Sequence, residues 1–236
     1  MTTTRARMIT VATATRQGTR EHNADSCAVH VYPVADVTAA AVVDGIGNSP
    51  EVVAASCVAA EVAVRVGARK GGLAGLLAAA ELYGDPGGVN VEPDAVAVLA
   101  LSEPGEDTRV HWIGDCRAWG FNGQTLRQYT TDHTMGEHLR QRGKPEVEAA
   151  LHDNWVRTSL ATATVSTVCF AEVPDRLVIL TSDGVHDALD RDVLEELVRT
   201  FPHAPQSLAD ALVSAARADG TGYRDDATAV VLLHHV

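Results

Sequence analysis

Aspartates stand at the ends of four apolar, strand-like runs of this sequence. Asp44 closes the run AAAVVDG and is followed by Gly45, and Asp183 closes LVILTSDG with a glycine after it. Asp115 follows the short run VHWIG, and Asp225 comes just before the run ATAVVLL. Carboxylates gathered at the mouth of a sheet repel one another and lose hydration, so they require compensation by a cation.

The chemistry that this pattern predicts is the binding of a hard divalent cation. Mg²⁺ and Mn²⁺ prefer oxygen ligands and retain several waters. Two such ions close together can bind phosphate oxygens and activate a water, without any nucleophilic side chain. At Gly45, the missing side chain would let the backbone carbonyl approach a metal. Each Asp-Gly pair alone has the alternative reading of a plain turn, but four acidic strand ends favour a metal site.

The elements that would position these aspartates come in blocks. Strands are expected at 8–15, 27–34, 37–43, 94–101, 108–114, 117–123, 124–130, 166–173, 176–182 and 227–236, and the four between 94 and 130 resemble a meander. Helices are expected at 50–68, 73–84, 187–201 and 206–220, with a turn at 85–88 and a helix plus a mobile loop over 132–158. Ser49 and Pro50 would open the first helix as its N-cap and N1 residues. This order predicts a single α+β domain over residues 1–236 rather than a βαβ alternation.

Composition excludes several classes of protein. The chain has 236 residues, of which 46% are apolar, and a formal charge of −12, which disfavours nucleic acid as a partner. No apolar run reaches the roughly eighteen residues of a membrane helix, and the N-terminus lacks the apolar core of a secretory signal. We therefore expect a cytoplasmic protein with no membrane partner. The four cysteines form no C-x-x-C pair, which predicts free thiols rather than a zinc site.

Six segments, in this order, resemble the metal-dependent protein serine/threonine phosphatases of type 2C, the PPM family, in their compact bacterial form. They are RQGTREHNADS, VVDGIGNS, WIGDCRAW, YTTDHTMGEHL, LTSDGVHDAL and DDATAVVL. The resemblance covers nearly the whole chain. It implies a four-layer α/β/β/α sandwich in which two central antiparallel sheets are flanked by helices.

The resemblance also implies a site with two or three Mn²⁺ or Mg²⁺ ions. The residues that it assigns to the metals are Asp44, Gly45 (through its carbonyl), Asp115, Asp183 and Asp225. Asp44 would bridge two ions, and Asp115 would form a third-ion site with Asp183 and Asp187. Arg20 would grip the substrate phosphate, and Asp25 would orient a metal-bound water. On the residues alone, Arg20 would be read as a solvated loop arginine, and only its spacing to Asp25 favours a role in the site; Asp25 could be an Asx-turn residue.

The sequence departs from the usual PPM pattern at several positions. Ala24 stands where a glutamate is usual, Asn48 where a second glycine is usual, and Asp226 where an asparagine is usual. Cys116 replaces a serine, and the segment from about 136 to 160, which corresponds to the family's flap, also differs. None of these departures removes an aspartate assigned to the metals.

Three histidines near these segments have alternative readings. His186 could donate a proton to the leaving group or be a partly exposed residue that opens a helix, and His22 has the same two readings. His133 is expected to make structural hydrogen bonds. The glycines after Asp44 do not indicate a nucleotide-binding loop, because proline occupies the third glycine position and the βαβ alternation is missing.

The function expected from the resemblance is hydrolysis of phosphoserine and phosphothreonine in proteins, by a monomer acting on targets of serine/threonine kinases. One alternative is a catalytically weak, phosphatase-like binding or scaffold protein. Another is a phosphatase dedicated to a regulator of a sigma-factor partner switch.

Overall fold

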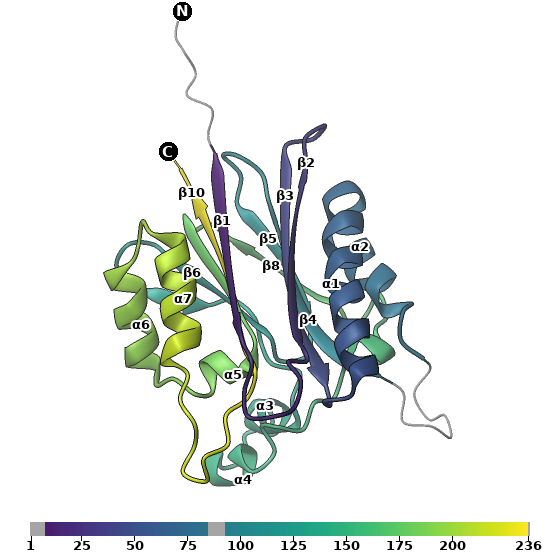
Figure 1. Cartoon of the computed structure of the whole chain (residues 1–236), viewed down its shortest axis with the longest axis vertical. Coiled ribbons are helices and arrows are strands. Elements are labelled where there is room, and N and C mark those ends of the chain that lie inside the picture. The colour runs from purple at the N-terminus through teal and green to yellow at the C-terminus, as the bar shows by residue number, and fades with distance from the viewer. Residues whose placement is uncertain (1–7, 85–92, 236) are drawn as a thin grey trace, which may run out of the picture.

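The computed structural model of the chain describes residues 8–84 and 93–235. The turn predicted at 85–88 lies outside these residues. Two antiparallel five-stranded sheets face each other, and helices cover the outer side of each sheet (Figure 1). The predicted α+β sandwich is confirmed.

The first sheet, sheet A, has the strand order β1-β10-β9-β6-β7. Its strands are β1 (Ile9–Arg16), β10 (Ala227–His234), β9 (Leu177–Thr181), β6 (Arg117–Phe121) and β7 (Leu126–Gln128). Helices α6 (Arg191–Thr200) and α7 (Pro205–Ala215) cover its outer face. Because β1 pairs with β10 so that Arg16 lies opposite Ala227, the segments that follow β1 and precede β10 meet at one end of the sheet.

The second sheet, sheet B, has the strand order β2-β3-β4-β5-β8. Its strands are β2 (Asp25–Tyr32), β3 (Val37–Ile46), β4 (Asp94–Ser102), β5 (Thr108–Ile113) and β8 (Cys169–Val173). Helices α1 (Pro50–Lys70) and α2 (Gly72–Ala80) cover its outer face. The predicted hairpin of the second and third strands is confirmed, with Asp25 opposite Asp44 in the register.

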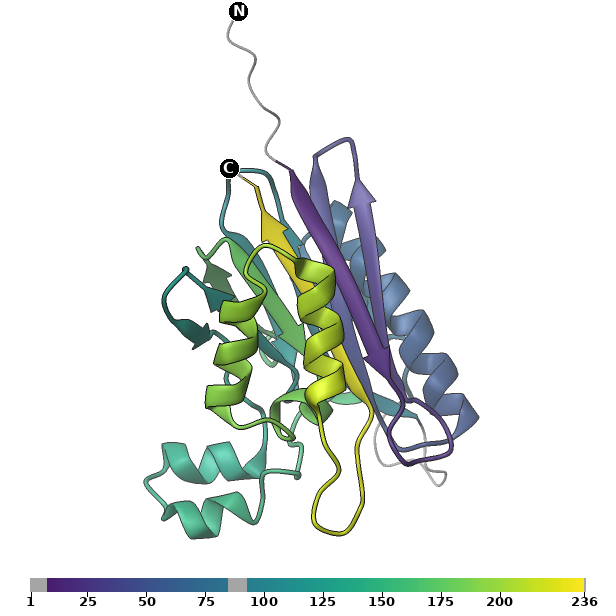
Figure 2. The ribbon, with the colours of Figure 1, turned by 60° about the vertical axis from the view of Figure 1, so that its left-hand side comes forward.

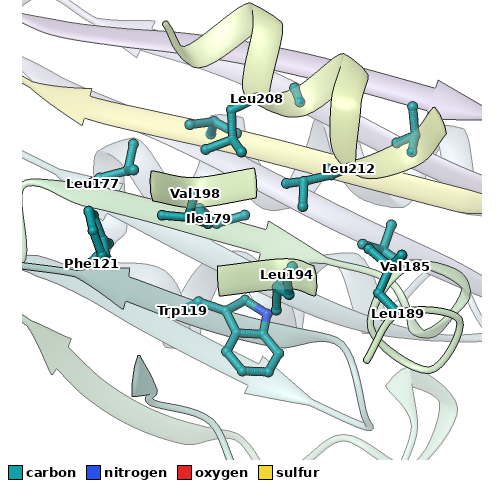
Figure 3. Packing of buried hydrophobic residues seen from close by; sticks show 14 of the residues in the cluster. Trp119, Phe121, Leu177, Ile179, Val185, Leu189, Leu194, Val198, Leu208 and Leu212 are labelled. Atoms are coloured by element: carbon teal, nitrogen blue, oxygen red, sulfur yellow. The ribbon is translucent and has the colours of Figure 1, made fainter. Parts of the chain in front are cut away.

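The apolar cores explain why these elements stay together. Leu208 and Leu212 of α7 belong to one buried cluster with Ile179 and Trp119 of sheet A, and Leu194 of α6 lies beside Trp119 (Figure 3). A second core lies between the two sheets, and a third lies between sheet B and its helices. The third core is rich in alanine, which lets α1 approach the sheet closely. A Cβ atom on Gly67 of α1 would stand only 2.9 Å from the Leu99 side chain.

The start of α1 agrees with the sequence prediction. The Ser49 side chain accepts a hydrogen bond from the backbone N–H of Val52 at 3.3 Å, and Pro50 is the first helical residue. This helix therefore begins directly after the loop that follows Asp44. No helix among the described residues is long and apolar enough to cross a membrane.

The meander predicted between 94 and 130 is wrong. Strands β4 and β5 pair in sheet B, whereas β6 and β7 pair in sheet A, so the chain changes sheets between Ile113 and Arg117. Gly114 makes the turn with φ +93°, and a Cβ atom there would collide with the Val96 side chain. The crossing places Asp115 at the same end of the sandwich as the other aspartates.

The segment predicted as a helix plus a mobile loop contains two short helices, α3 (Met135–Gln141) and α4 (Glu146–Ala150). They form a hairpin at the lower end of the molecule, close to the long loop between α7 and β10 (Figure 2). A Cβ atom on Gly136 would lie 2.7 Å from the Ala149 carbonyl oxygen, so glycine permits this close packing. A 3₁₀ turn, η1 (Leu160–Thr162), follows.

Candidate active site

The aspartates at the strand ends converge at one end of the sandwich. A cleft of about 570 Å³ is lined by all the residues assigned to metals or phosphate except Asp25, namely Arg20, Asp44, Gly45, Asp115, Asp183 and Asp225. Asp25 lies behind this surface and is buried. The fold therefore brings residues of motifs that lie far apart in the sequence together in one place.

Both sheets contribute to the cleft. Asp44 belongs to β3 of sheet B, near the end of a strand three residues longer than the predicted 37–43. Asp183 begins α5 (Asp183–His186), one helical turn that the sequence reading missed, directly after β9 of sheet A. Asp225 precedes β10 of the same sheet. The carboxylates are thus held by strand ends that the three apolar cores fix in place.

Asp44 and Asp183 face each other across the gap between the sheets. Burial, followed by the negative charges of Asp183, Asp25 and Asp115, raises the pKa of Asp44 well above its usual range. Burial and the charge of Asp225 raise the pKa of Asp183 to about 6.

Asp25 and Asp115 add to the same negative field. Burial raises the pKa of Asp25 to about 7, although a hydrogen bond from the Ser182 hydroxyl at 2.7 Å acts in the opposite direction. Burial and the charge of Asp183 raise the pKa of Asp115 to about 7. The negative charges of these two carboxyl groups and of Asp44 and Asp183 are therefore poorly compensated by the protein itself.

The donor set fits hard divalent cations. All the side-chain donors of the assigned residues are carboxylate oxygens, which Mg²⁺ and Mn²⁺ prefer, and a cation would relieve the repulsion that raises these pKa values. Within residues 8–84 and 93–235, no three His, Cys, Asp or Glu side chains are already arranged to hold an ion by themselves. An ion here would take much of its coordination from water and backbone carbonyls, as Mg²⁺ commonly does.

Gly45 is required for packing as well as for access. A Cβ atom at this position would stand 2.6 Å from the side chains of both Ser56 and Val52 of α1, and 2.8 Å from the Ala24 carbonyl oxygen. The Gly45 N–H donates to that same carbonyl at 3.2 Å. Glycine therefore lets α1 lie directly against the strand end that carries Asp44.

Arg20 is half-buried at the edge of the cleft. Its Nη2 donates to both oxygens of Asp225 at 2.7 and 2.8 Å, and its Nε donates to the Tyr223 hydroxyl at 2.7 Å. Burial lowers the pKa of the guanidinium, but the hydrogen bond to Tyr223 and the charge of Asp225 outweigh it and raise the pKa. Arg20 is thus a charged group that points into the cleft, not a solvated loop arginine.

A second, strongly polar cavity of about 640 Å³ adjoins the cleft under the α3–α4 hairpin. Its wall includes Arg117, which donates to Asp132 through Nε at 3.1 Å and through Nη2 at 2.6 Å. Arg117 also lies 3.8 Å from Asp187, whose side chain is 53% exposed. The sequence reading did not assign a role to Arg117 or Asp132, although both lie in its motif-like segments.

Solved structures share this architecture. The sequence matches no protein-family model and no curated protein. The PPM Ser-Thr phosphatase MsPP from Mycobacterium smegmatis, solved in complex with cacodylate, is 25% identical with a TM-score of 0.74, over 95% of this chain and 97% of that one. The chain has the PPM phosphatase fold.

Two further solved serine/threonine phosphatases are similar to the chain over nearly its whole length. The catalytic domain of the serine/threonine phosphatase PstP, solved with two manganese ions, is 21% identical with a TM-score of 0.73, over 97% of this chain and 99% of that one. A serine/threonine phosphatase of S. agalactiae is 16% identical with a TM-score of 0.79, over 97% of this chain and 100% of that one. The resemblance predicted from the motifs is confirmed.

Two departures from the usual PPM pattern have structural explanations. Asp226, where asparagine is usual, is buried and accepts hydrogen bonds from the backbone N–H groups of Gly18 at 2.7 Å and Ala24 at 2.9 Å. Ala24 is itself buried among these backbone contacts. A carboxylate at 226 therefore fastens the loop that carries Arg20, and no side chain at position 24 takes part.

The other departures are also accommodated by the PPM fold. The Asn48 side chain accepts a hydrogen bond from the His22 N–H at 3.2 Å and donates to the His22 carbonyl, which ties two loops of the site together. Cys116 is buried in the core between the sheets, and burial raises the pKa of its thiol well above the usual range. It therefore packs as a small apolar residue.

His186 is buried, so the reading of a partly exposed residue is wrong. Its Nδ1 lies 2.8 Å from the Thr181 hydroxyl, which accepts a hydrogen bond from Trp119 Nε1 at 3.1 Å. Burial, and then the charge of Arg117, lowers the pKa of His186 well below its usual range. The imidazole is neutral at physiological pH and is poorly suited to donate a proton as an acid.

His133 makes the structural hydrogen bonds that the sequence predicted. Its Nδ1 accepts from the Gly114 N–H at 3.2 Å, and its Nε2 lies 3.3 Å from the Cys169 sulfur. Its backbone N–H also donates to the Gly114 carbonyl at 3.0 Å. His133 thus fixes the turn on which Asp115 stands.

Proposed function

We propose that the protein is a metal-dependent phosphatase that hydrolyses phosphoserine and phosphothreonine in other proteins. The observation that carries this proposal is a single cleft in which closely spaced carboxylates lie beside the fixed guanidinium of Arg20. Carboxylates suit the cations that bind phosphate, and a guanidinium suits the phosphate itself. The PPM phosphatase fold of the chain supports the same conclusion.

Each residue assigned to the metals or to the activated water has a definite task in this proposal. Mn²⁺ or Mg²⁺, two or three ions, would supply Lewis-acid stabilisation of the phosphate and an activated water. Asp44 and Asp183 would hold ions from opposite sheets, with Asp225, Asp115 and the Gly45 carbonyl completing the protein ligands. Asp25 would accept a hydrogen bond from a water and orient it.

Arg20 would bind the phosphate oxygens of the substrate. Its planar guanidinium can form parallel hydrogen bonds to phosphate and carries a permanent positive charge. A fixed cation at this place stabilises the negative charge of the phosphate in the bound substrate and in the transition state alike. We expect the substrates to be targets of serine/threonine kinases and the protein to act as a monomer, with the segment 136–160 as its flap.

The proposal is tested by metal-dependent hydrolysis of p-nitrophenyl phosphate. Mn²⁺ should activate the wild-type protein, and Asp44→Ala or Asp183→Ala should lower kcat by about a hundredfold or more, because each removes a metal ligand worth several kcal/mol in the transition state. Asp107→Asn, a change on an exposed turn, is the matched control and should leave kcat unchanged.

A negative result would have a specific meaning. If folded wild-type protein binds Mn²⁺ by isothermal titration calorimetry but hydrolyses neither p-nitrophenyl phosphate nor a phosphothreonine peptide, the enzymatic proposal is wrong. The phosphatase-like binding protein would then be the better description of this chain.

A further inference from the structure

Tyr223 lies on the loop between α7 and β10 and contacts the guanidinium of Arg20. Its hydroxyl accepts the hydrogen bond from Arg20 Nε at 2.7 Å, and its ring centroid lies 5.6 Å from the central carbon of the guanidinium. Tyr223 also lines the cleft. None of the six motif-like segments includes this residue.

We infer that Tyr223 is a positioning residue for Arg20, which sets the orientation in which the guanidinium meets a phosphate group. The inference rests on the proposed function, because it assigns Arg20 to phosphate. It adds a residue and a loop that the motifs do not contain.

The geometry of the guanidinium shows why the hydroxyl matters. The group is a rigid plane with five N–H donors, so fixing one edge fixes the direction of the others. Tyr223 takes the Nε edge, and the Gly47 carbonyl oxygen lies 3.3 Å from Nη1. With these two contacts in place, the plane cannot turn about its long axis.

The contact with Asp225 cannot perform this task alone. Asp225 is also a proposed metal ligand, and a carboxylate that binds a cation attracts the guanidinium less strongly. The Tyr223 hydroxyl is a neutral acceptor and is not itself a proposed metal ligand, although it lies beside the Asp225 carboxylate. It can therefore hold Arg20 in the same orientation with or without an ion nearby.

The loop that presents Tyr223 is ordered by its own hydrogen bonds. Asp219 Oδ1 accepts from the Thr221 N–H at 2.8 Å, the Thr221 hydroxyl at 2.6 Å and the Tyr223 N–H at 3.0 Å. The Asp219 N–H donates to the Tyr223 carbonyl at 2.7 Å. Asp219 thus closes a turn that holds Tyr223 over Arg20.

The test compares Tyr223→Phe with Tyr129→Phe. Both tyrosines donate or accept a hydrogen bond through the hydroxyl and lie over an arginine, but the Tyr129 hydroxyl binds Asp175 at the opposite end of β9. With Mg²⁺ present, Tyr223→Phe should weaken the affinity for inorganic phosphate about fivefold to tenfold as measured by titration calorimetry, which corresponds to the net contribution of one ordinary hydrogen bond. It should raise KM for p-nitrophenyl phosphate by a similar factor while kcat changes by less than about twofold.

Two further measurements separate positioning from a general loss of structure. Mn²⁺ affinity and Tm of Tyr223→Phe should stay at the wild-type values. In the background of Arg20→Ala, adding Tyr223→Phe should have no further effect on phosphate affinity, because the two residues act as a unit. Asp219→Ala should reproduce part of the loss of phosphate affinity.

Several results would overturn the inference. These are equal phosphate affinities for Tyr223→Phe and Tyr129→Phe, additive effects with Arg20→Ala, or a parallel loss of phosphate and Mn²⁺ affinity in Tyr223→Phe. Phosphate titration does not depend on turnover. A wild type that binds phosphate but does not hydrolyse esters therefore refutes the phosphatase proposal and still tests the role of Tyr223.

Discussion

The apolar core of sheet A and the acidic cleft at its end are formed by the same strands, but one buries apolar side chains and the other buries charged ones. All five residues of β9 are buried, and Ile179 in its middle belongs to the apolar core between sheet A and its helices (Figure 3). Two residues after this strand, Asp183 is one of several carboxyl groups with raised pKa values. Burial stabilises the first region, whereas burial of charge destabilises the second.

The contrast shows that burial in the core offsets the destabilising repulsion between carboxylates in the cleft. A cluster of like charges survives in a fold only if the rest of the structure holds its members in place, and active sites commonly reduce stability in this way. Changes in the core should therefore alter stability and leave the chemistry intact. Changes in the cleft should alter the chemistry and the response to pH.

The largest effect on stability is expected from Ile179→Ala. This residue is fully buried, and the truncation should lower the free energy of unfolding by about 3 kcal/mol, from lost burial plus the cavity left behind. Urea denaturation measures this change, and kcat/KM at low temperature should remain close to wild type. A loss of less than about 1 kcal/mol would mean that the core repacks and does not hold the cleft as described.

The sequence revealed the cleft better than it revealed the path of the chain. Strand ends bearing aspartate have a local signal, because an apolar run ends in a charge. The change of sheet between β5 and β6 has no such signal, since Gly114 reads equally well as a hairpin turn. Pairing between distant strands decides which sheet a strand joins, and local pattern does not encode it.

The contacts missed by sequence reading are those made between segments far apart in the chain. Arg20 and Tyr223 are separated by 203 positions, and Asn48 meets His22 across two loops. The separation of the two residues along the sequence does not indicate a contact in either pair. His186 shows the same limit, because Asp183 and Asp187 flank it in the sequence, whereas the fold buries its ring against Trp119.

An intermediate effect on stability is expected from pH. Asp25 and Asp115 have pKa values of about 7, well above the usual Asp value of about 4. Between about pH 4 and pH 7, the folded protein therefore binds more protons than the unfolded chain. Their stabilisation is fully present below about pH 4 and is lost as pH rises through 7. His111, which is half-buried, and His186, which is buried, have lowered pKa values, so their contribution to stability is complete above about pH 6.5.

The metal-free protein should therefore lose Tm between pH 6.5 and pH 8, and Mn²⁺ should restore it. Differential scanning calorimetry in the presence of a chelator measures this loss. Asp115→Asn should flatten the dependence, because it removes one of the titrating groups, while Asp107→Asn should not. A Tm that stays constant or rises over this range without metal would show that the carboxylates are compensated within the protein.

The smallest effect is expected from Asn48→Gly, which restores the usual residue of the motif. The substitution removes two hydrogen bonds to the His22 backbone and should lower stability by about 1 kcal/mol. His22 lies two residues from Arg20, so the loop that carries the guanidinium should exchange its amide protons faster, and KM should rise about twofold. Asn48→Asp, which keeps the acceptor, is the matched variant and should restore part of the stability. If Asn48→Gly instead leaves stability and amide exchange unchanged, this asparagine does not fasten the loop, and the cleft is held by the apolar cores and Asp226 alone.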